Sequence, residues 1–234
     1  MEIKSLSWKQ AEQLRDANSI AIVPLGSTEQ HAYLSLATDT ILATKLAIES
    51  SAGLDVAIFP CLPYGLVPQF KGFVGTISLR STTYLLVVED ILRGLFDQGF
   101  SRIFIINGHG GNIPAKAVMS EVLNDYPACL VQWHDWWIAS QTYAKVLEID
   151  PVASHASWME NFPWTRLSEV ESPKTQKPMV DLAKLRQLSS ERAKEFLGDG
   201  NFGGHYQRSD EEMLEIWEVA KQETRSLITN GWAF

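Results

Sequence analysis

Short apolar runs alternate with amphipathic segments along the first 134 residues of this chain, and few folds can accommodate such an alternation. The runs are rich in β-branched and aromatic residues and too short for typical helices, which predicts strands over 19–24, 55–63, 101–108 and 128–134. Between them, apolar residues recur at helical spacing, which predicts helices over 38–51, 81–99 and 112–126. The alternation is typical of an α/β fold in which helices cover both faces of a largely parallel sheet.

The last third of the chain is less regular but contains two further segments with helical periodicity, at 181–198 and 209–228. The second begins with Ser209 and Glu212, whose spacing matches a capping box. No internal repeat or clean linker divides the 234 residues, and a hydrophobic content of 45% is sufficient for one sizeable core. We therefore expect a single domain over residues 1–234.

Charge and composition exclude several classes of function. The formal net charge of −8, with no cluster of Lys and Arg, argues against a nucleic-acid partner. No apolar run reaches the roughly 18 residues of a membrane span, and the N-terminal stretch MEIKSLSWKQ lacks the apolar core of a signal peptide. We therefore expect no membrane partner and a cytoplasmic location. Cys61 and Cys129 lie far apart in apolar runs, which favours reduced thiols over a disulfide or a Cys-based metal site.

Two carboxylates and an imidazole follow the first predicted strand, in the stretch GSTEQHAYLSLATD (26–39). Glu29 and His31 are two residues apart, so in an extended backbone their side chains point to the same face. Asp39 comes eight residues later, where the next helix is predicted to begin. Because ligands of α/β proteins bind at the C-terminal ends of parallel strands, this loop could offer three ligand atoms to one site.

A second strand end carries His109, within the stretch IFIINGHGGN (103–112). Three glycines around it leave the imidazole room to project into a cleft. Clusters of His and carboxylates suit Zn²⁺, Mn²⁺ or Fe²⁺, and an Asp shared between two ions is a common way to hold a binuclear site. Taken alone, each of these side chains could instead be a helix cap or a solvated loop residue. The glycines could cradle an anion, although NGHGGN matches neither the G-x-G-x-x-G nor the P-loop pattern.

Four separated stretches resemble motifs of the creatininase family, the creatinine amidohydrolase-like metal-dependent amidohydrolases. They occur in the family's order between Val23 and Asn161, and a weaker likeness continues over 198–216. The stretches are GSTEQH with TD (26–39), GFVGTISL (72–79), GFSRIFIINGHGGN (99–112) and HASWMEN (155–161). Within the family, NGHGGN resembles the branches of formamide deformylases and of mycofactocin-type peptide-maturation peptidases.

The resemblance implies a three-layer α/β/α sandwich with two divalent ions at the C-terminal ends of the strands. Glu29, Asp39 and His109 would hold one ion. His31, Asp39 and a further carboxylate would hold the second. The ions implied are zinc, with manganese and iron as alternatives, and the family also implies homo-oligomers, commonly hexamers.

The further carboxylate is where the chain departs from creatininases proper, which carry Glu at the position of Gly111. Glu160, five residues after His155, is the candidate that replaces it. A helix would place these two side chains about 140° apart, so we expect a break or turn between them. The loop before Asp39 also lacks the family's second His, and this and other departures remove polar groups from the expected substrate rim.

His155 resembles the family's general acid/base, because an imidazole titrates near neutral pH; the alternative is a buried structural histidine. Trp136 and Trp158 are expected to bind substrate as a stacking wall, with packing in the core or at a subunit interface as the alternative for each. We expect His134 to be a packing or supporting residue and His205 to be a surface or loop residue.

The resemblance therefore implies hydrolysis of a C–N amide-type bond in a small molecule, such as a cyclic amide or a formamide, by a metal-activated water. Two alternatives remain open. One is a peptidase that acts in the maturation of a peptide-derived cofactor, and the other is a binding protein that has lost catalysis.

Overall fold

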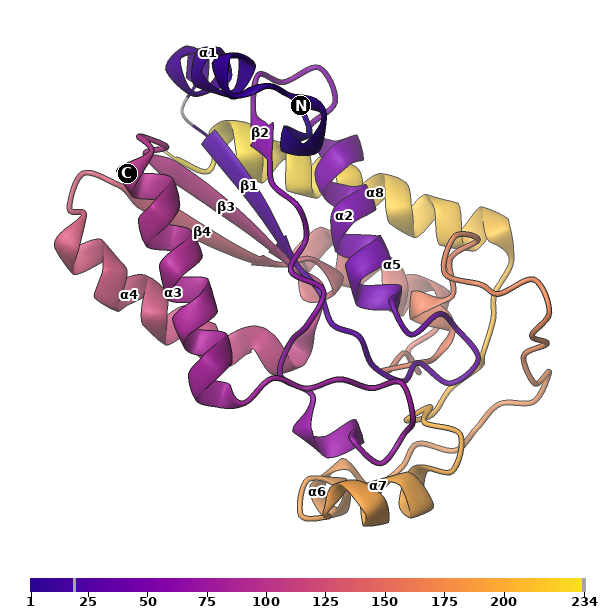
Figure 1. The fold of residues 1–234 in the computed structure, drawn as a ribbon. Coiled ribbons are helices and arrows are strands. Elements are labelled where there is room, and N and C mark those ends of the chain that lie inside the picture. The colour runs from indigo at the N-terminus through magenta and orange to yellow at the C-terminus, as the bar shows by residue number, and fades with distance from the viewer. Residues whose placement is uncertain (19, 233–234) are drawn as a thin grey trace.

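Four parallel strands form the centre of the molecule (Figure 1). The computed structural model describes residues 1–18 and 20–232, so Ser19, where the first predicted strand begins, lies outside the described residues. The strand order is β2-β1-β3-β4, and each neighbouring pair is parallel. The strands are β1 (Ile20–Leu25), β2 (Ala57–Ile58), β3 (Arg102–Asn107) and β4 (Leu130–Asp135). The predicted parallel sheet is confirmed.

Helices cover both faces of this sheet, which confirms the three-layer α/β/α architecture (Figure 1). Helices α3 and α4 lie on one face, and α2, α5 and α8 lie on the other. The α-helices are α1 (Trp8–Asn18), α2 (Thr38–Ser50), α3 (Ser81–Asp97), α4 (Lys116–Asp125), α5 (Ser140–Ile149), α6 (Leu182–Leu185), α7 (Ser190–Leu197) and α8 (Asp210–Asn230). Short 3₁₀ segments are η1 (Ile3–Ser5), η2 (Pro68–Phe70), η3 (Gly110–Ala115), η4 (Trp136–Ile138) and η5 (Trp158–Glu160). Among the described residues, no helix is both long and apolar enough to cross a membrane.

The central strands bury side chains on both faces, which explains why they appear in the sequence as continuous apolar runs. Ala21 and Val23 of β1 pack in one core cluster with Leu92 of α3. Ile20 and Ile22 point the other way and pack in a second cluster with residues of α2 and α8. All positions of β1 are buried, so this strand joins the two helix layers through the sheet.

Strand β2 is much shorter than the predicted strand over 55–63, because only two of those residues pair regularly with β1. The regular ladder ends after Phe59, whose N–H donates to the Ile22 carbonyl, and pairing resumes only as an isolated bridge at Leu62. Pro24 of β1 accounts for this interruption, because it has no N–H to donate to the neighbouring strand. Its carbonyl accepts a hydrogen bond from Leu62 N, so its missing N–H also faces the side where the ladder is irregular.

The predicted helices in the first half are present with changed boundaries. The helix expected over 112–126 begins as the 3₁₀ segment η3, which contains Pro114, and becomes α-helical only in α4. Helix α1 was not expected from the sequence, and the structure shows why: Leu14 is its only buried residue, so it lacks a wide apolar stripe.

The helix expected over 181–198 is instead two short helices, α6 and α7. The break between them lets Leu185 and Leu197 pack with Phe70 of η2 in a third apolar cluster. Helix α8 agrees with the prediction, and Ser209 and Glu212 form the expected capping box. The third cluster places α6 and α7 beside the loops that follow the strands.

Buried His134 generates a prediction about stability. Its Nε2 lies 3.0 Å from Thr224 Oγ1, and burial lowers its pKa to about 4. Because the unfolded state takes up a proton first, near pH 6.5, the neutral side chain stabilises the fold fully above that pH and loses this contribution as the pH falls toward 4. The loss should reach about 3 kcal/mol.

Urea unfolding at pH 7 and pH 4.5 would measure this effect, with His134→Gln as the non-titrating comparison. We expect the variant to lose less stability than the wild type between the two pH values. Equal losses in both proteins would contradict the assignment, because every other titrating group is common to them.

Candidate metal centre

The candidate site lies at the C-terminal end of the sheet, where β1 and β3 end. Glu29 and His31 lie in the loop after β1, Asp39 lies in the first turn of α2, and His109 follows β3. All four are buried. Glu160 approaches them from η5, in the second half of the chain. The fold therefore brings together the five residues for which the sequence analysis predicts metal binding.

Asp39 lies between the two histidines and contacts both. Its Oδ1 is 3.0 Å from Nε2 of His31, and its Oδ2 is 3.0 Å from Nδ1 of His109. Ser27 donates a hydrogen bond from Oγ to the same Oδ2 at 2.7 Å, which fixes the carboxylate plane. Each oxygen of Asp39 thus faces a different imidazole, as in a carboxylate that bridges two ions.

The ligand atoms form two overlapping groups. Those of Glu29, Asp39 and His109 lie within 4.8 Å of one another. Those of His31, Asp39 and Glu160 meet the same limit. These are the two sets that the resemblance implies, and Asp39 belongs to both.

Backbone carbonyls set which nitrogen of each histidine faces the site. Nδ1 of His31 is 3.2 Å from the carbonyl of Glu29, and Nε2 of His109 is 3.0 Å from the carbonyl of Leu66. A carbonyl can only accept, so these nitrogens carry the proton of the neutral ring. The lone pairs of the other nitrogens then point at the Asp39 oxygens. Such contacts repel unless a cation lies between them, and this second hydrogen bond is the usual support of a metal-binding histidine.

Glu29 provides a second sign that the site fits a cation. Both of its carboxylate oxygens are buried, and neither accepts a hydrogen bond within the described part of the chain. Its Oε1 lies 2.9 Å from Nδ1 of His109, which is a favourable contact only if that nitrogen binds a proton or a metal ion. Burial of an uncompensated carboxylate is costly, so a bound cation would stabilise this arrangement.

The pKa shifts of His31, Glu160 and Glu29 also indicate that positive charge is favoured at this site. Burial alone would lower the pKa of His31, but Asp39, Glu160 and Glu29 outweigh it and raise that pKa to about 10. Burial raises the pKa of Glu160 to about 7 and also raises the pKa of Glu29. These shifts all favour positive charge around Asp39, which bound divalent cations would also supply.

The position of Gly111 explains why the second carboxylate comes from elsewhere. A Cβ at residue 111 would lie 2.0 Å from the Leu66 carbonyl oxygen and 2.4 Å from Nε2 of His109, so only glycine fits. Glu160 reaches the site because the chain turns sharply at Ala156, which has a φ of 58°. Ala156 N donates to Glu160 Oε2 at 2.6 Å. This is the turn that the sequence analysis required.

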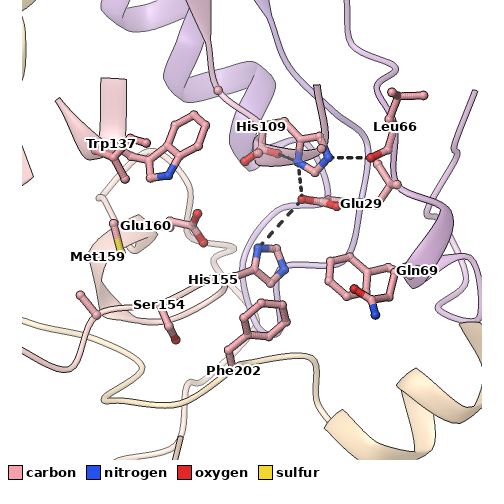
Figure 2. A pocket seen from close by; sticks show the side chains of 18 of the residues that line it. Glu29, Leu66, Gln69, His109, Trp137, Ser154, His155, Met159, Glu160 and Phe202 are labelled. Atoms are coloured by element: carbon pink, nitrogen blue, oxygen red, sulfur yellow. Dashed lines mark hydrogen bonds and ion pairs between the residues drawn. The ribbon is translucent and has the colours of Figure 1, made fainter. Parts of the chain in front are cut away.

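His155 lies beside these groups, with Nδ1 4.0 Å from Glu29 Oε1 (Figure 2). Its ring is stacked on Phe70 at a centroid distance of 5.1 Å and contacts Phe202 at 4.9 Å. Burial and the neighbouring His31 lower its pKa well below the usual value, so the neutral ring is favoured. His155, Glu29 and His31 form a third group with metal-binding spacing.

A cavity of about 590 Å³ opens above the ligand groups. Figure 2 shows Glu29, Glu160 and His155 directed toward it. Its walls are mainly apolar and include Leu66, Phe70, Trp137, Tyr143, Met159 and Phe202. The cavity can therefore exclude water from a bound molecule while presenting one strongly polar end.

The structure places Trp136 and Trp158 in the core rather than in this cavity. Trp136 packs edge-on against Trp217 of α8, and Trp158 is fully buried and donates from Nε1 to a backbone carbonyl. The 3₁₀ segment η4 rotates successive side chains, so that Trp136 points inward and Trp137 lines the cavity. This corrects the expectation that Trp136 and Trp158 form the wall.

Two other cavity residues carry no motif in the sequence. Gln69 lies in η2, and Arg186 ends α6. Of the remaining histidines, His134 packs against Phe104 and α8, and His205 lies half-buried in a loop, as expected for each.

Comparisons with known proteins found relatives that match about half of this chain. Mycofactocin precursor peptide peptidase of Mycolicibacterium smegmatis is 34% identical over 125 residues, which are 50% of this chain and 50% of that protein. Creatinine amidohydrolase of Pseudomonas putida is 30% identical over 117 residues, 47% of this chain and 45% of that protein. The chain thus matches about half the length of these curated relatives.

Over the whole chain, the fold is similar to the crystal structure of a creatinine amidohydrolase (creatininase), with a TM-score of 0.81 and 22% identity. The similarity covers 100% of this chain and 98% of that one. The sequence profile described as creatininase, creatinine amidohydrolase, matches residues 4–228. Because that match leaves only the two ends of the chain uncovered, this protein belongs to the creatininase family.

Proposed function

We propose that this protein is a metal-dependent hydrolase of a C–N amide-type bond. The observation that carries the proposal is the two groups of carboxylate and imidazole ligand atoms that share Asp39 and border a largely apolar cavity. The names of the two relatives, an amidohydrolase and a peptidase, support the same reaction class.

In this proposal Glu29, Asp39 and His109 hold one divalent ion, and His31, Asp39 and Glu160 hold the other. Two such ions would polarise the amide carbonyl and lower the pKa of a shared water toward neutrality. Zinc suits this mixture of nitrogen and oxygen ligands, with manganese and iron as alternatives. Solved creatininases of this fold include a Zn-Zn form and a Mn form.

The protein side chains would bind and orient the amide. The apolar walls exclude water, which strengthens polar contacts at the reacting group. His155 faces the same end of the cavity and is the proposed catalytic residue, in contact with the amide group that reacts. By its resemblance to the family's general acid/base, it would take part in proton transfer.

Arg186 favours a substrate with an anionic end. Among the described residues it is the only Lys or Arg that lines the cavity, and its exposed side chain is free of protein partners and so available to a bound molecule. A carboxylate on the substrate would supply a partner. The cavity, at about 590 Å³, is large enough for a small cyclic amide or a formamide. The carboxylate at the end of a peptide could pair with Arg186 equally well, so the peptidase function stays an alternative.

Family resemblance also implies assembly as a homo-hexamer, and composition and cysteine usage favour a single domain over residues 1–234 and a cytoplasmic location. We propose these together with the function. Sedimentation of the purified protein would test the assembly.

Metal content gives the first test. Asp39→Ala removes the shared ligand and should abolish tight binding of both ions, whereas Glu160→Ala should abolish only one. Each variant should lose more metal affinity than the roughly 10- to 100-fold that is typical when a residue that only hydrogen-bonds to a metal ligand is replaced. Elemental analysis of desalted protein would measure it, with Glu195→Ala on the exposed surface of α7 as the control. An Asp39→Ala protein that retained two ions would contradict the ligand sets.

Activity gives the second test. A screen of creatinine, cyclic ureides, formamides and short peptides should identify an amide that is hydrolysed only with bound metal. Chelation should abolish turnover, and zinc or manganese should restore it. Full activity in a metal-free preparation would overturn the proposal, and two bound ions without turnover of any class would favour the binding-protein alternative.

Substrate charge gives the third test. Arg186→Gln should raise KM about 10-fold for substrates that carry a carboxylate, because a charge-assisted hydrogen bond is lost. It should leave KM unchanged for the matching amides or esters of the same carboxylate. Arg192→Gln on α7, outside the cavity lining, is the matched control. Equal effects on charged and uncharged substrates would contradict the proposed role.

A further inference from the structure

Gln30 lies between two proposed metal ligands in the sequence, but its side chain reaches away from them toward residues of the second half of the chain. It is buried. Its Oε1 accepts a hydrogen bond from Ala32 N at 3.1 Å, and its Nε2 donates to the Gly200 carbonyl at 3.2 Å. A backbone N–H can only donate and a carbonyl can only accept, so these two contacts fix which end of the amide is nitrogen.

The backbone at Ala32 and at Gly200 contacts this amide closely and holds it in one orientation. Ala32, whose N–H donates to Gln30 Oε1, adopts a left-handed conformation with a φ of 51°, so the chain turns sharply next to the amide. A Cβ at Gly200 would lie 1.7 Å from that same oxygen, so the chain can approach closely only at a glycine. Turning the amide over would break both hydrogen bonds and leave buried polar groups unpaired, at a cost of about 1–3 kcal/mol for each group.

The fixed amide determines the protonation of His155. Gln30 Nε2 is 2.8 Å from His155 Nε2. An amide nitrogen has no available lone pair, so it must be the donor and His155 Nε2 must be the unprotonated acceptor. The neutral imidazole therefore carries its proton on Nδ1. Phe70 stacks on the ring and Phe202 packs against both, while Nδ1 lies 4.0 Å from Glu29 Oε1 and faces the metal centre (Figure 2).

We propose that Gln30 is a positioning residue that holds His155 as a neutral hydrogen-bond donor, with Nδ1–H directed at the oxygen of the reacting amide. This differs from the general acid/base role expected from the sequence. In this tautomer Nδ1 has no lone pair to take up a proton or to bind a metal, and an imidazolium would place Nε2–H against the Gln30 amide donor. His155 is then not a ligand, although it lies in the third group with Glu29 and His31.

The chemical role follows from the tautomer. A neutral imidazole N–H can stabilise the negative charge that develops on the carbonyl oxygen when water attacks, and it gives up no proton in doing so. The water loses one proton and the leaving nitrogen gains one, so hydrolysis balances without a proton stored on His155. This role rests on the proposed amide hydrolysis, but the tautomer itself does not.

Nitrogen NMR of the zinc-loaded protein, labelled with ¹⁵N-histidine, would test the tautomer without any substrate. Loss of a signal in His155→Asn assigns the ring. We expect Nδ1 of His155 to have the shift of a protonated nitrogen and Nε2 that of an unprotonated one. The reverse pattern in the wild type would overturn the proposal. The expected pattern in a protein that hydrolyses no amide would overturn only the proposed function.

Gln30→Glu supplies the decisive variant, because a carboxylate in place of the amide accepts a hydrogen bond from Nε2–H and should reverse the tautomer. For a substrate found in the screen, kcat should fall about 100-fold, as for loss of one oxyanion donor, with little change in KM. Gln30→Met, which neither donates nor accepts, should give a mixture of tautomers and a smaller loss.

Gln69→Glu is the matched control, because Gln69 lines the same cavity but donates to the Leu185 carbonyl and not to His155. It adds the same negative charge and should leave the His155 tautomer unchanged. Retained metal content and circular dichroism would show that the variants fold. An unchanged tautomer in folded Gln30→Glu, or a reversal in Gln69→Glu, would contradict the proposal.

Discussion

The contact of one carboxylate, that of Asp39, with two histidines on different loops organises this end of the molecule. It requires helix α2 to begin against the ends of both β1 and β3. A Cβ at Gly26, just after β1, would lie 2.4 Å from Thr40 Oγ1, and a Cβ at Gly108, just after β3, would lie 2.6 Å from the Asp39 carbonyl oxygen. Glycine at both strand ends therefore lets the first turn of α2 occupy the centre of the site. The parallel sheet brings the two loops that carry the histidines together, because its strands all end at the same edge.

Much of the fold could be predicted from the sequence because its signals are local. The strands of the central sheet, helices α2, α3 and α8 and the capping box at Ser209 each follow from periodicity or from one short motif. The errors arise where tertiary structure overrides the pattern. The strand over 55–63 is shorter than predicted because Pro24 of the neighbouring strand has no N–H to pair with it, and the helix over 181–198 divides so that both halves can pack on η2.

The candidate site also combines residues that the sequence could predict with residues that only the fold reveals. Spacing and family resemblance predict Glu29, His31, Asp39, His109 and Glu160, and the fold brings these five together. Sequence could not decide which tryptophan faces the cavity, because Trp136 and Trp137 are adjacent and only the 3₁₀ geometry of η4 separates their directions. Gln69 and Arg186 carry no motif and reach the cavity only because η2, α6 and α7 pack together.

The hydrogen bond from Gln30 to the Gly200 carbonyl joins residues that are 170 positions apart. The half of the chain that contains Gly200 also supplies helix α8 and the residues around Trp158, which cover one face of the sheet. Glu160 and the Gly200 carbonyl therefore come from segments that the core needs as well. A chain that lacked these segments would lose the second ligand group and, at the same time, the packing on one face of β1 and β3.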